Sequence, residues 1–332
     1  MLLIRMLAVA GVAYALSARA DCPKKYTVET YFQRKDLPDK PNSRCDVKNG
    51  KCVKIQLTGR LYRPDPSTKG PHPILIMNHG SGQPVNPDCE MGQYFSQRGY
   101  LVFIPSRRGH EGSTGAYFDQ YTSTYCQKKG DDGFCKMAYL HEQVDDVKEA
   151  IEFARKQPGV DKDQVALIGH SFGGIVTLFS NQKDLGQRAV VDVAGGSQSW
   201  PRPQENSAGN PDAVRELEQA VRDAVAPIFF FEPMNDRSID PTIHLARIAG
   251  HNCKQFQAAL YPAIDVSGDG DKPDGKITGA DYASPDIRDR AHTGTMSQPE
   301  VWGPAVEEFL ARYLKGTVRF GEMCKGTSHQ EQ

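Results

Sequence analysis

The sequence lacks a strong net charge, a zinc-type cysteine pair and a long apolar stretch, and each absence argues against one kind of partner or site. The 332 residues carry 40 lysines and arginines against 41 aspartates and glutamates, so the net charge of -1 indicates neither nucleic acid nor an anionic membrane surface as a partner. None of the 8 cysteines forms a C-x-x-C pair, which argues against a zinc cluster. No apolar stretch reaches the about 20 residues of a comfortable membrane span.

What the N-terminus does contain is the pattern of a secretory signal peptide over residues 1–20. Arg5 precedes an apolar run from Met6 to Leu16, and Ala18-Arg19-Ala20 provides an A-x-A cleavage pattern. We expect cleavage after Ala20, export to the periplasm or the medium, and no stable membrane association afterwards. The alternatives are an uncleaved anchor and lipid attachment at Cys22, although the residues before this cysteine differ from the small, apolar run that lipid attachment resembles.

The cysteines agree with export, because an even set in an exported protein suggests disulfide bonds. The segment "CDVKNGKC", from Cys45 to Cys52, and the segment "CQKKGDDGFC", from Cys126 to Cys135, each surround a turn that contains glycine. Local pairing is plausible in both segments, and the sequence leaves the full connectivity open.

Strand and helix patterns alternate through most of the chain. Apolar runs such as "HPILIMN" are typical of strands buried on both faces, as in a parallel sheet. Strands are expected within 54–63, 72–78, 100–105, 164–168, 189–196, 227–233 and 256–262, and helices within 141–157, 175–179, 211–226, 240–250 and 304–314. The order predicts an α/β fold with a doubly wound, mostly parallel sheet.

We expect residues 21–332 to form one domain with inserted segments. The insertions are expected near 116–140 and 196–211, the second as a cap over the carboxyl edge of the sheet. Trp200 lies in the second insertion, where it either lines the cap or is exposed in a loop.

The segment "LIGHSFGGIV", residues 167–176, places a hydroxyl between a predicted strand and a predicted helix. Its G-x-S-x-G core puts Ser171 on a strained turn above the sheet, and Gly169 and Gly173 remove side chains that would collide there. The helix N-terminus behind Ser171 favours developing negative charge. This context predicts a nucleophilic serine, although G-x-S-x-G alone also fits an ordinary glycine-rich turn.

A serine nucleophile needs a base that an acid orients, and in this fold the chain order is Ser, acid, His. Asp236 follows the predicted strand "PIFFFEP" and is the expected acid, with Glu232 and Asp240 as alternatives; Asp240 has the position of a helix N-cap. His292 follows the last predicted strand and precedes the closing helix, so it is the expected base. The other later histidines fit less well: His244, His251 and His329.

Two backbone N–H groups are expected to bind the oxyanion of the tetrahedral intermediate. One is that of Phe172, directly after the nucleophile. The other belongs to the loop "HGSG" and is assigned to Ser81, with Gly82 as the alternative. His79 in the same loop is interpreted as a structural residue.

The ordered set "HGSG", "SRRGHEGSTG", "GHSFGG", "MNDRS" and "AHTG" resembles the α/β-hydrolases over roughly residues 53–315. Within them it is similar to the dienelactone hydrolases and related exported esterases, although Ser171 stands where dienelactone hydrolases often carry cysteine. The resemblance implies an enzyme that hydrolyses a small carboxylic ester, with no metal or organic cofactor required. Two alternatives are a serine peptidase of the same fold and a non-catalytic, calcium-stabilised binding protein on this scaffold.

A second motif, "DGDKPDGKITGAD", resembles a calcium-binding loop of the EF-hand type. Its candidate oxygen ligands are Asp269, Asp271, Asp274 and Asp281. An extra residue precedes Asp274, and aspartate stands where glutamate is usual, so an acidic surface loop is the alternative. A bound calcium ion would have a structural role.

Overall fold

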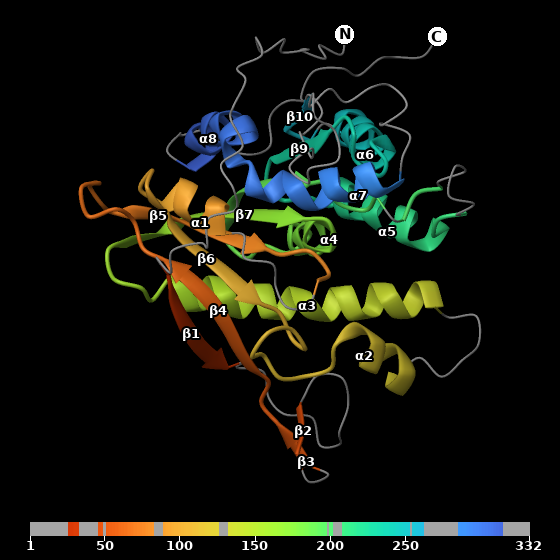
Figure 1. The fold of residues 1–332 in the computed structure, drawn as a ribbon, viewed down its shortest axis with the longest axis horizontal. Coiled ribbons are helices and arrows are strands. Elements are labelled where there is room, and N and C mark those ends of the chain that lie inside the picture. The colour runs from red at the N-terminus through yellow and green to blue at the C-terminus, as the bar shows by residue number, and fades with distance from the viewer. Residues whose placement is uncertain are drawn as a thin grey trace, which may run out of the picture.

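The computed structural model describes residues 26–32, 46–48, 51–82, 89–125, 132–197, 199–201, 208–252, 254–261 and 285–314 (Figure 1). Eight strands form one sheet in the order β1-β4-β6-β5-β7-β8-β9-β10. The pairs β1/β4 and β4/β6 are antiparallel, and every other neighbouring pair is parallel. The predicted mostly parallel α/β sheet is therefore confirmed.

The strands at the centre of this sheet are short apolar runs buried on both faces, whereas the edge strands β1 and β10 are partly exposed. Their bounds are β1 Thr27–Phe32, β4 Gln56–Tyr62, β5 His72–Asn78, β6 Leu101–Ser106, β7 Val160–His170, β8 Gln187–Val193, β9 Ile228–Pro233 and β10 Phe256–Tyr261. A separate antiparallel hairpin joins β2 (Asp46–Lys48) to β3 (Lys51–Val53).

Helices cover both faces of the sheet. Their bounds are α1 Cys89–Ser96, α2 Phe118–Tyr125, α3 Asp132–Ala154, α4 Phe172–Ser180, α5 Pro211–Arg222, α6 Asp240–His251, α7 Pro285–Gly294 and α8 Pro299–Leu314. Because side chains alternate along a strand, Ile74 and Ile76 of β5 pack with α3 to α6, whereas Leu75 and Met77 pack with α1 and α8. Figure 1 shows α8 and α3 on opposite sides of the sheet.

Several elements differ from the expectation. The helix predicted from residue 141 already begins at Asp132, so the expected insertion at 116–140 consists of α2 and the first turns of α3 in its described residues. The strand β1 and the helices α1 and α7 were not predicted. Trp200 is only 7% exposed and packs 5.6 Å from the ring of His244, so it is a core residue rather than an exposed loop aromatic.

Some predictions concern residues outside the described part of the chain. These are the signal peptide 1–20 and the acidic loop with Asp269, Asp271, Asp274 and Asp281. Cys52 and Cys89 are disulfide-bonded, but each predicted local pair includes a cysteine whose side chain is outside the description. No helix in the described residues is both long and apolar enough to cross a membrane.

The strand register brings the carboxyl ends of the central strands together. Asn78 of β5 pairs with Gly169 of β7, His170 of β7 pairs with Val193 of β8, and Val193 in turn pairs with Phe231 of β9. Loops that follow parallel strands at this edge therefore lie side by side, which is where ligands bind in open α/β sheets.

Candidate active site

A single residue, Ser171, connects β7 to α4. Its backbone has φ 55° and ψ -117°, a conformation that is strained for a residue with a side chain. The strain is maintained by its neighbours, because the Ser171 N–H donates to the carbonyl of Val193 at 2.9 Å. The sharp strand-to-helix bend that the G-x-S-x-G pattern indicated is present.

The glycines on either side of Ser171 are required by close backbone contacts. A Cβ atom on Gly169 would lie 2.1 Å from the carbonyl oxygen of Gly173, and a Cβ atom on Gly173 would lie 2.0 Å from the carbonyl oxygen of Asn78. Neither space accommodates a methyl group, so the glycines allow α4 to approach β5 and β7 closely.

Replacing Gly173 by alanine is therefore expected to lower the free energy of unfolding by at least about 2 kcal/mol, since overpacking against backbone forces the helix to move. Gly250→Ala in α6 is the matched control, because its Cβ would lie 3.4 Å from the Phe256 ring and the helix gains propensity. Urea unfolding of both variants tests this. Equal stability of the two variants would contradict the close approach at Gly173.

His292 and Asp236 form a buried hydrogen-bonded pair. The Nδ1 atom of His292 donates to the carboxylate of Asp236, at 2.8 Å from Oδ1 and 2.9 Å from Oδ2. The two side chains are 2% and 0% exposed. The backbone N–H of Arg237 also donates to Asp236 Oδ1 at 2.6 Å, which fixes the carboxylate. This arrangement holds the imidazole in one tautomer, with Nε2 able to accept a proton.

The Nε2 atom of His292 is buried and has no hydrogen-bond partner among the described residues. Buried polar atoms are rarely left unpaired, and those that are unpaired call for a functional explanation. An imidazole nitrogen that lies ready to accept a proton provides one.

The alternative acids do not make this contact. The carboxylate of Glu232 is buried on β9, and burial together with the charge of Asp236 raises its pKa well above the usual range. Asp240 is exposed at the first position of α6, and the N-cap is Ile239 rather than Asp240. Within the described residues, Asp236 is the carboxylate that bonds His292.

His170, which the sequence analysis did not single out, joins the serine turn to the base. Its Nε2 donates to the carbonyl oxygen of His292 at 2.9 Å, and the two rings lie 4.7 Å apart. Burial, and then the neighbouring His292, lower the pKa of His170 well below its usual range, so this ring is neutral. Since His170 directly precedes Ser171, this bond brings the segment with His292 next to the serine turn, although 122 residues separate the two bonded residues.

The loop after β5 runs beside the same turn. A Cβ on Gly80 would lie 3.7 Å from the Cβ of Ser171. The next residue, Ser81, is exposed, and its carbonyl accepts a hydrogen bond from Tyr117 Oη at 3.0 Å. Phe172 is the first residue of α4, so its N–H belongs to the turn that has no intrahelical acceptors. The placement of Ser81 and Phe172 is compatible with the predicted oxyanion contacts.

A buried carboxyl group on β8 makes the stability of the protein depend on pH. Asp192 is 0% exposed, no described cation forms an ion pair with it, and burial raises its pKa to about 7. In the unfolded chain the pKa of aspartate is about 3.9. Between these values the unfolded state releases a proton that the folded state retains, so the contribution of Asp192 to stability is fully present below about pH 4 and is lost as the pH rises to 7.

Asp192→Asn removes this titration, so the stability of the variant relative to the wild type is expected to rise between pH 4.5 and 7.5. The slope is at most about 1.4 kcal/mol per pH unit. Glu232 has the same trend and is present in both proteins. Urea unfolding at the two pH values measures the difference, and a difference that does not change with pH would refute the assignment.

Comparison with known proteins supports one superfamily. Residues 53–213 match the X-Pro dipeptidyl-peptidase family S15. A polyketide transferase, grgF, of Penicillium sp is 26% identical over 235 residues, which are 68% of this chain and 66% of that protein. The acylaminoacyl peptidase of Pyrococcus horikoshii superposes with a TM-score of 0.54 at 16% identity, over 90% of this chain and 43% of that one.

A shorter protein of known structure also superposes on this chain. Est1E from Butyrivibrio proteoclasticus, solved with ferulic acid, superposes with a TM-score of 0.52 at 13% identity, over 79% of this chain and 96% of that one. The chain has the α/β-hydrolase fold. The match to the S15 family spans just under half of the chain, and it supports a hydrolase of the serine type. The chain spans less than half of the peptidase and about two thirds of the transferase.

Proposed function

We propose that this α/β-hydrolase is an exported serine hydrolase that cleaves carboxylic esters through an acyl-enzyme on Ser171. The observation that carries the proposal is the buried His292–Asp236 pair, in which Nε2 of His292 has no partner among the described residues and the His292 carbonyl is bonded to His170, directly before the strained serine. A strained serine, an oriented imidazole and a buried carboxylate are the parts that nucleophilic acyl transfer requires.

The proposed reaction uses the described residues in two half-reactions. His292 Nε2 takes the hydroxyl proton as Ser171 Oγ attacks the acyl carbonyl, and Asp236 stabilises the imidazolium that results. The N–H groups of Phe172 and Ser81 bind the oxyanion. The imidazolium then gives its proton to the leaving alcohol. Water attacks the acyl-enzyme in the same way, with His292 as base, and releases the acid. None of these steps uses a metal or an organic cofactor.

Peptide hydrolysis is the second candidate, and the S15 match favours it. Ester cleavage is proposed first because it is the easier reaction: an alcohol leaves more readily than an amine and depends less on a positioned acid. The chain contributes the serine, base and acid in either case, so the acyl and leaving groups decide between the two functions.

Matched substrates distinguish the two candidates. We expect p-nitrophenyl esters of rising acyl length to be hydrolysed much faster than p-nitroanilides with the same acyl groups, including X-Pro anilides. Faster cleavage of an X-Pro anilide than of its ester would indicate the peptidase instead. Cleavage of neither series would reject both, and it would favour a non-catalytic binding protein.

Export is proposed from the signal-peptide pattern of residues 1–20 and is supported by the disulfide bonds of Cys52 and Cys89, which form in oxidising compartments. N-terminal sequencing of the protein recovered outside the cytoplasm is expected to begin at Asp21. A mature protein that begins at Met1 would contradict cleavage.

Calcium binding by the acidic loop likewise stays a prediction, and calorimetric titration with calcium tests it.

A further inference from the structure

Arg107 is a fully buried cation beneath the loop that follows β5. Its Nη1 donates to the carbonyl of His79 at 2.7 Å, its Nη2 donates to the carbonyl of Gly80 at 3.1 Å, and its Nε donates to Gln143 Oε1 at 2.6 Å. It is 0% exposed and forms no ion pair within the described part of the chain. Burial lowers its pKa to about 10, so the guanidinium is charged at neutral pH.

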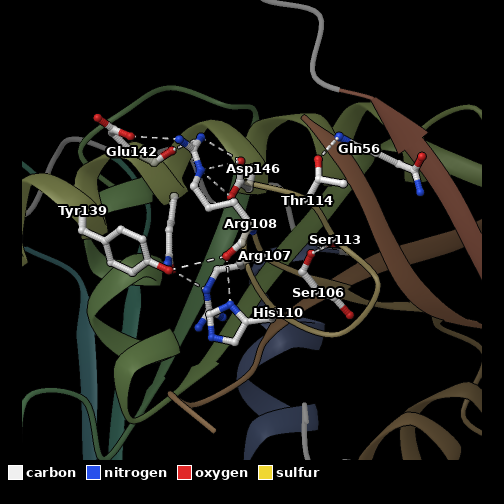
Figure 2. Close-up of polar contacts among 11 residues, drawn as sticks. Gln56, Ser106, Arg107, Arg108, His110, Ser113, Thr114, Tyr139, Glu142 and Asp146 are labelled. Atoms are coloured by element: carbon white, nitrogen blue, oxygen red, sulfur yellow. Dashed lines mark hydrogen bonds and ion pairs between the residues drawn. The ribbon is translucent and has the colours of Figure 1, made fainter. Parts of the chain in front are cut away.

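The neighbouring arginine has a different environment. Arg108 forms a fork with Asp146, with Nη2 at 2.9 Å from Oδ1, and its Nη1 lies 2.9 Å from Glu142 Oε2 (Figure 2). Arg108 therefore anchors the loop after β6 to α3 through two carboxylates. Arg107 instead directs its charge at two backbone carbonyls.

This charge is costly for stability. Burying a cation without an acidic partner carries a desolvation penalty of several kcal/mol, and apolar replacements of buried charges are often neutral or stabilising. Hydrogen bonds to carbonyls recover only part of this cost. Packing alone therefore does not explain a guanidinium at this position, which indicates a role in the adjacent site.

The geometry of the peptide bond between Gly80 and Ser81 connects Arg107 to the adjacent site. The C=O and N–H of a trans peptide point in opposite directions, and the cis peptide bond of the described residues is Gly70-Pro71. Because Arg107 and the Nδ1 of His79 both bind the Gly80 carbonyl, the N–H of Ser81, on the other edge of the same peptide, is directed away from Arg107.

The loop that contains Arg107 is itself held in place. Ser113 Oγ donates to the carbonyl of Ser106 at 2.6 Å, and the N–H of Gln56 donates to Thr114 Oγ1 at 3.0 Å (Figure 2). These contacts close the loop on both sides of the arginine pair. The guanidinium is therefore fixed before a substrate binds.

We propose that Arg107 is a positioning residue for the oxyanion hole: it fixes the Gly80–Ser81 peptide so that the Ser81 N–H is presented to the oxyanion, and its buried charge polarises that peptide. A cation bound to a carbonyl strengthens the N–H donor of the same peptide, and the low dielectric of the interior leaves its charge weakly screened. The inference rests on the proposed acyl-enzyme mechanism.

The test compares Arg107→Lys and Arg107→Met with the wild type. Both kcat and the affinity for a trifluoromethyl ketone, which forms a hemiketal oxyanion on a catalytic serine, are expected to fall together. The expected loss is roughly 10-fold for Arg107→Lys and roughly 100-fold for Arg107→Met, near the 10²-fold effect of removing one oxyanion donor. KM is expected to change little, because the ground-state carbonyl does not require the contact.

Arg108→Lys is the matched control, since Arg108 is equally buried but faces α3. It is expected to lower the melting temperature while kcat and inhibitor affinity of the folded enzyme stay near wild type.

Folded Arg107 variants with unchanged kcat, or with reduced kcat but full ketone affinity, would overturn the inference. If Arg107→Met does not fold, Arg107→Lys decides by the same comparison. An inactive wild type would overturn the proposed function and this inference together, whereas an active wild type with unaffected Arg107 variants overturns the inference alone.

Discussion

Replacing Ser171 by alanine is expected to lower kcat for ester hydrolysis by roughly 10⁴- to 10⁶-fold, which is the range seen when a serine nucleophile is removed. The change deletes a single oxygen atom at a bend that the backbone maintains through the bond from the Ser171 N–H to Val193. The fold is therefore expected to remain intact. The measurement is the kcat of the purified variant, with circular dichroism and melting temperature recorded on the same sample.

The control for this prediction is the double variant with His292→Ala. Residues that act as one unit lose their effect together, so the double variant is expected to be no slower than Ser171→Ala alone. A second loss as large as the first would show that His292 acts independently of Ser171. Ester hydrolysis that survives Ser171→Ala at the wild-type rate would remove the proposed nucleophile.

Asp236→Asn is expected to lower kcat by about 10⁴-fold, as when the acid of a serine triad is replaced by its amide. Asparagine can donate a hydrogen bond to Nδ1 and thereby place the His292 proton on Nε2, where the base must accept one. The amide also removes the charge that stabilises the imidazolium. The near-isosteric replacement keeps the packing, so the loss is expected in kcat rather than in folding.

The sequence provides two controls for Asp236, which are the other carboxylates considered for the role. Asp240→Asn is expected to leave kcat within about twofold, because Asp240 is exposed at the start of α6. Glu232→Gln is also expected to leave kcat near wild type, since the raised pKa already keeps this buried group neutral. A large loss of kcat in either variant, with little loss in Asp236→Asn, would show that the other carboxylate, and not Asp236, is the acid that orients His292.

The predictions that succeeded for the fold depend on local patterns. The sheet was predictable because its central strands are continuous apolar runs such as "ILIM" in β5. The serine bend was predictable because the two glycines and the hydroxyl fall within five residues, where a tight turn is determined locally.

The features that were missed depend on contacts between distant residues. The sequence does not predict α7, because residues 285–294 are mostly polar and lack an apolar stripe, yet His292 lies in the last turn of this helix. His170 and Arg107 gain their roles from partners 122 and 28 positions away. The double arginine directly after an apolar strand was a signal that could have been used, because two charges at the edge of a buried sheet require partners.

The most direct test of the account is to identify the residue that carries the acyl group. The enzyme is mixed with a slowly hydrolysed ester, quenched in acid and digested, and the modified peptide is sequenced by mass spectrometry. The account predicts one acyl group on Ser171, absent from the Ser171→Ala variant. An acyl group on another residue, or turnover of the ester with no covalent intermediate under any quench condition, would contradict it.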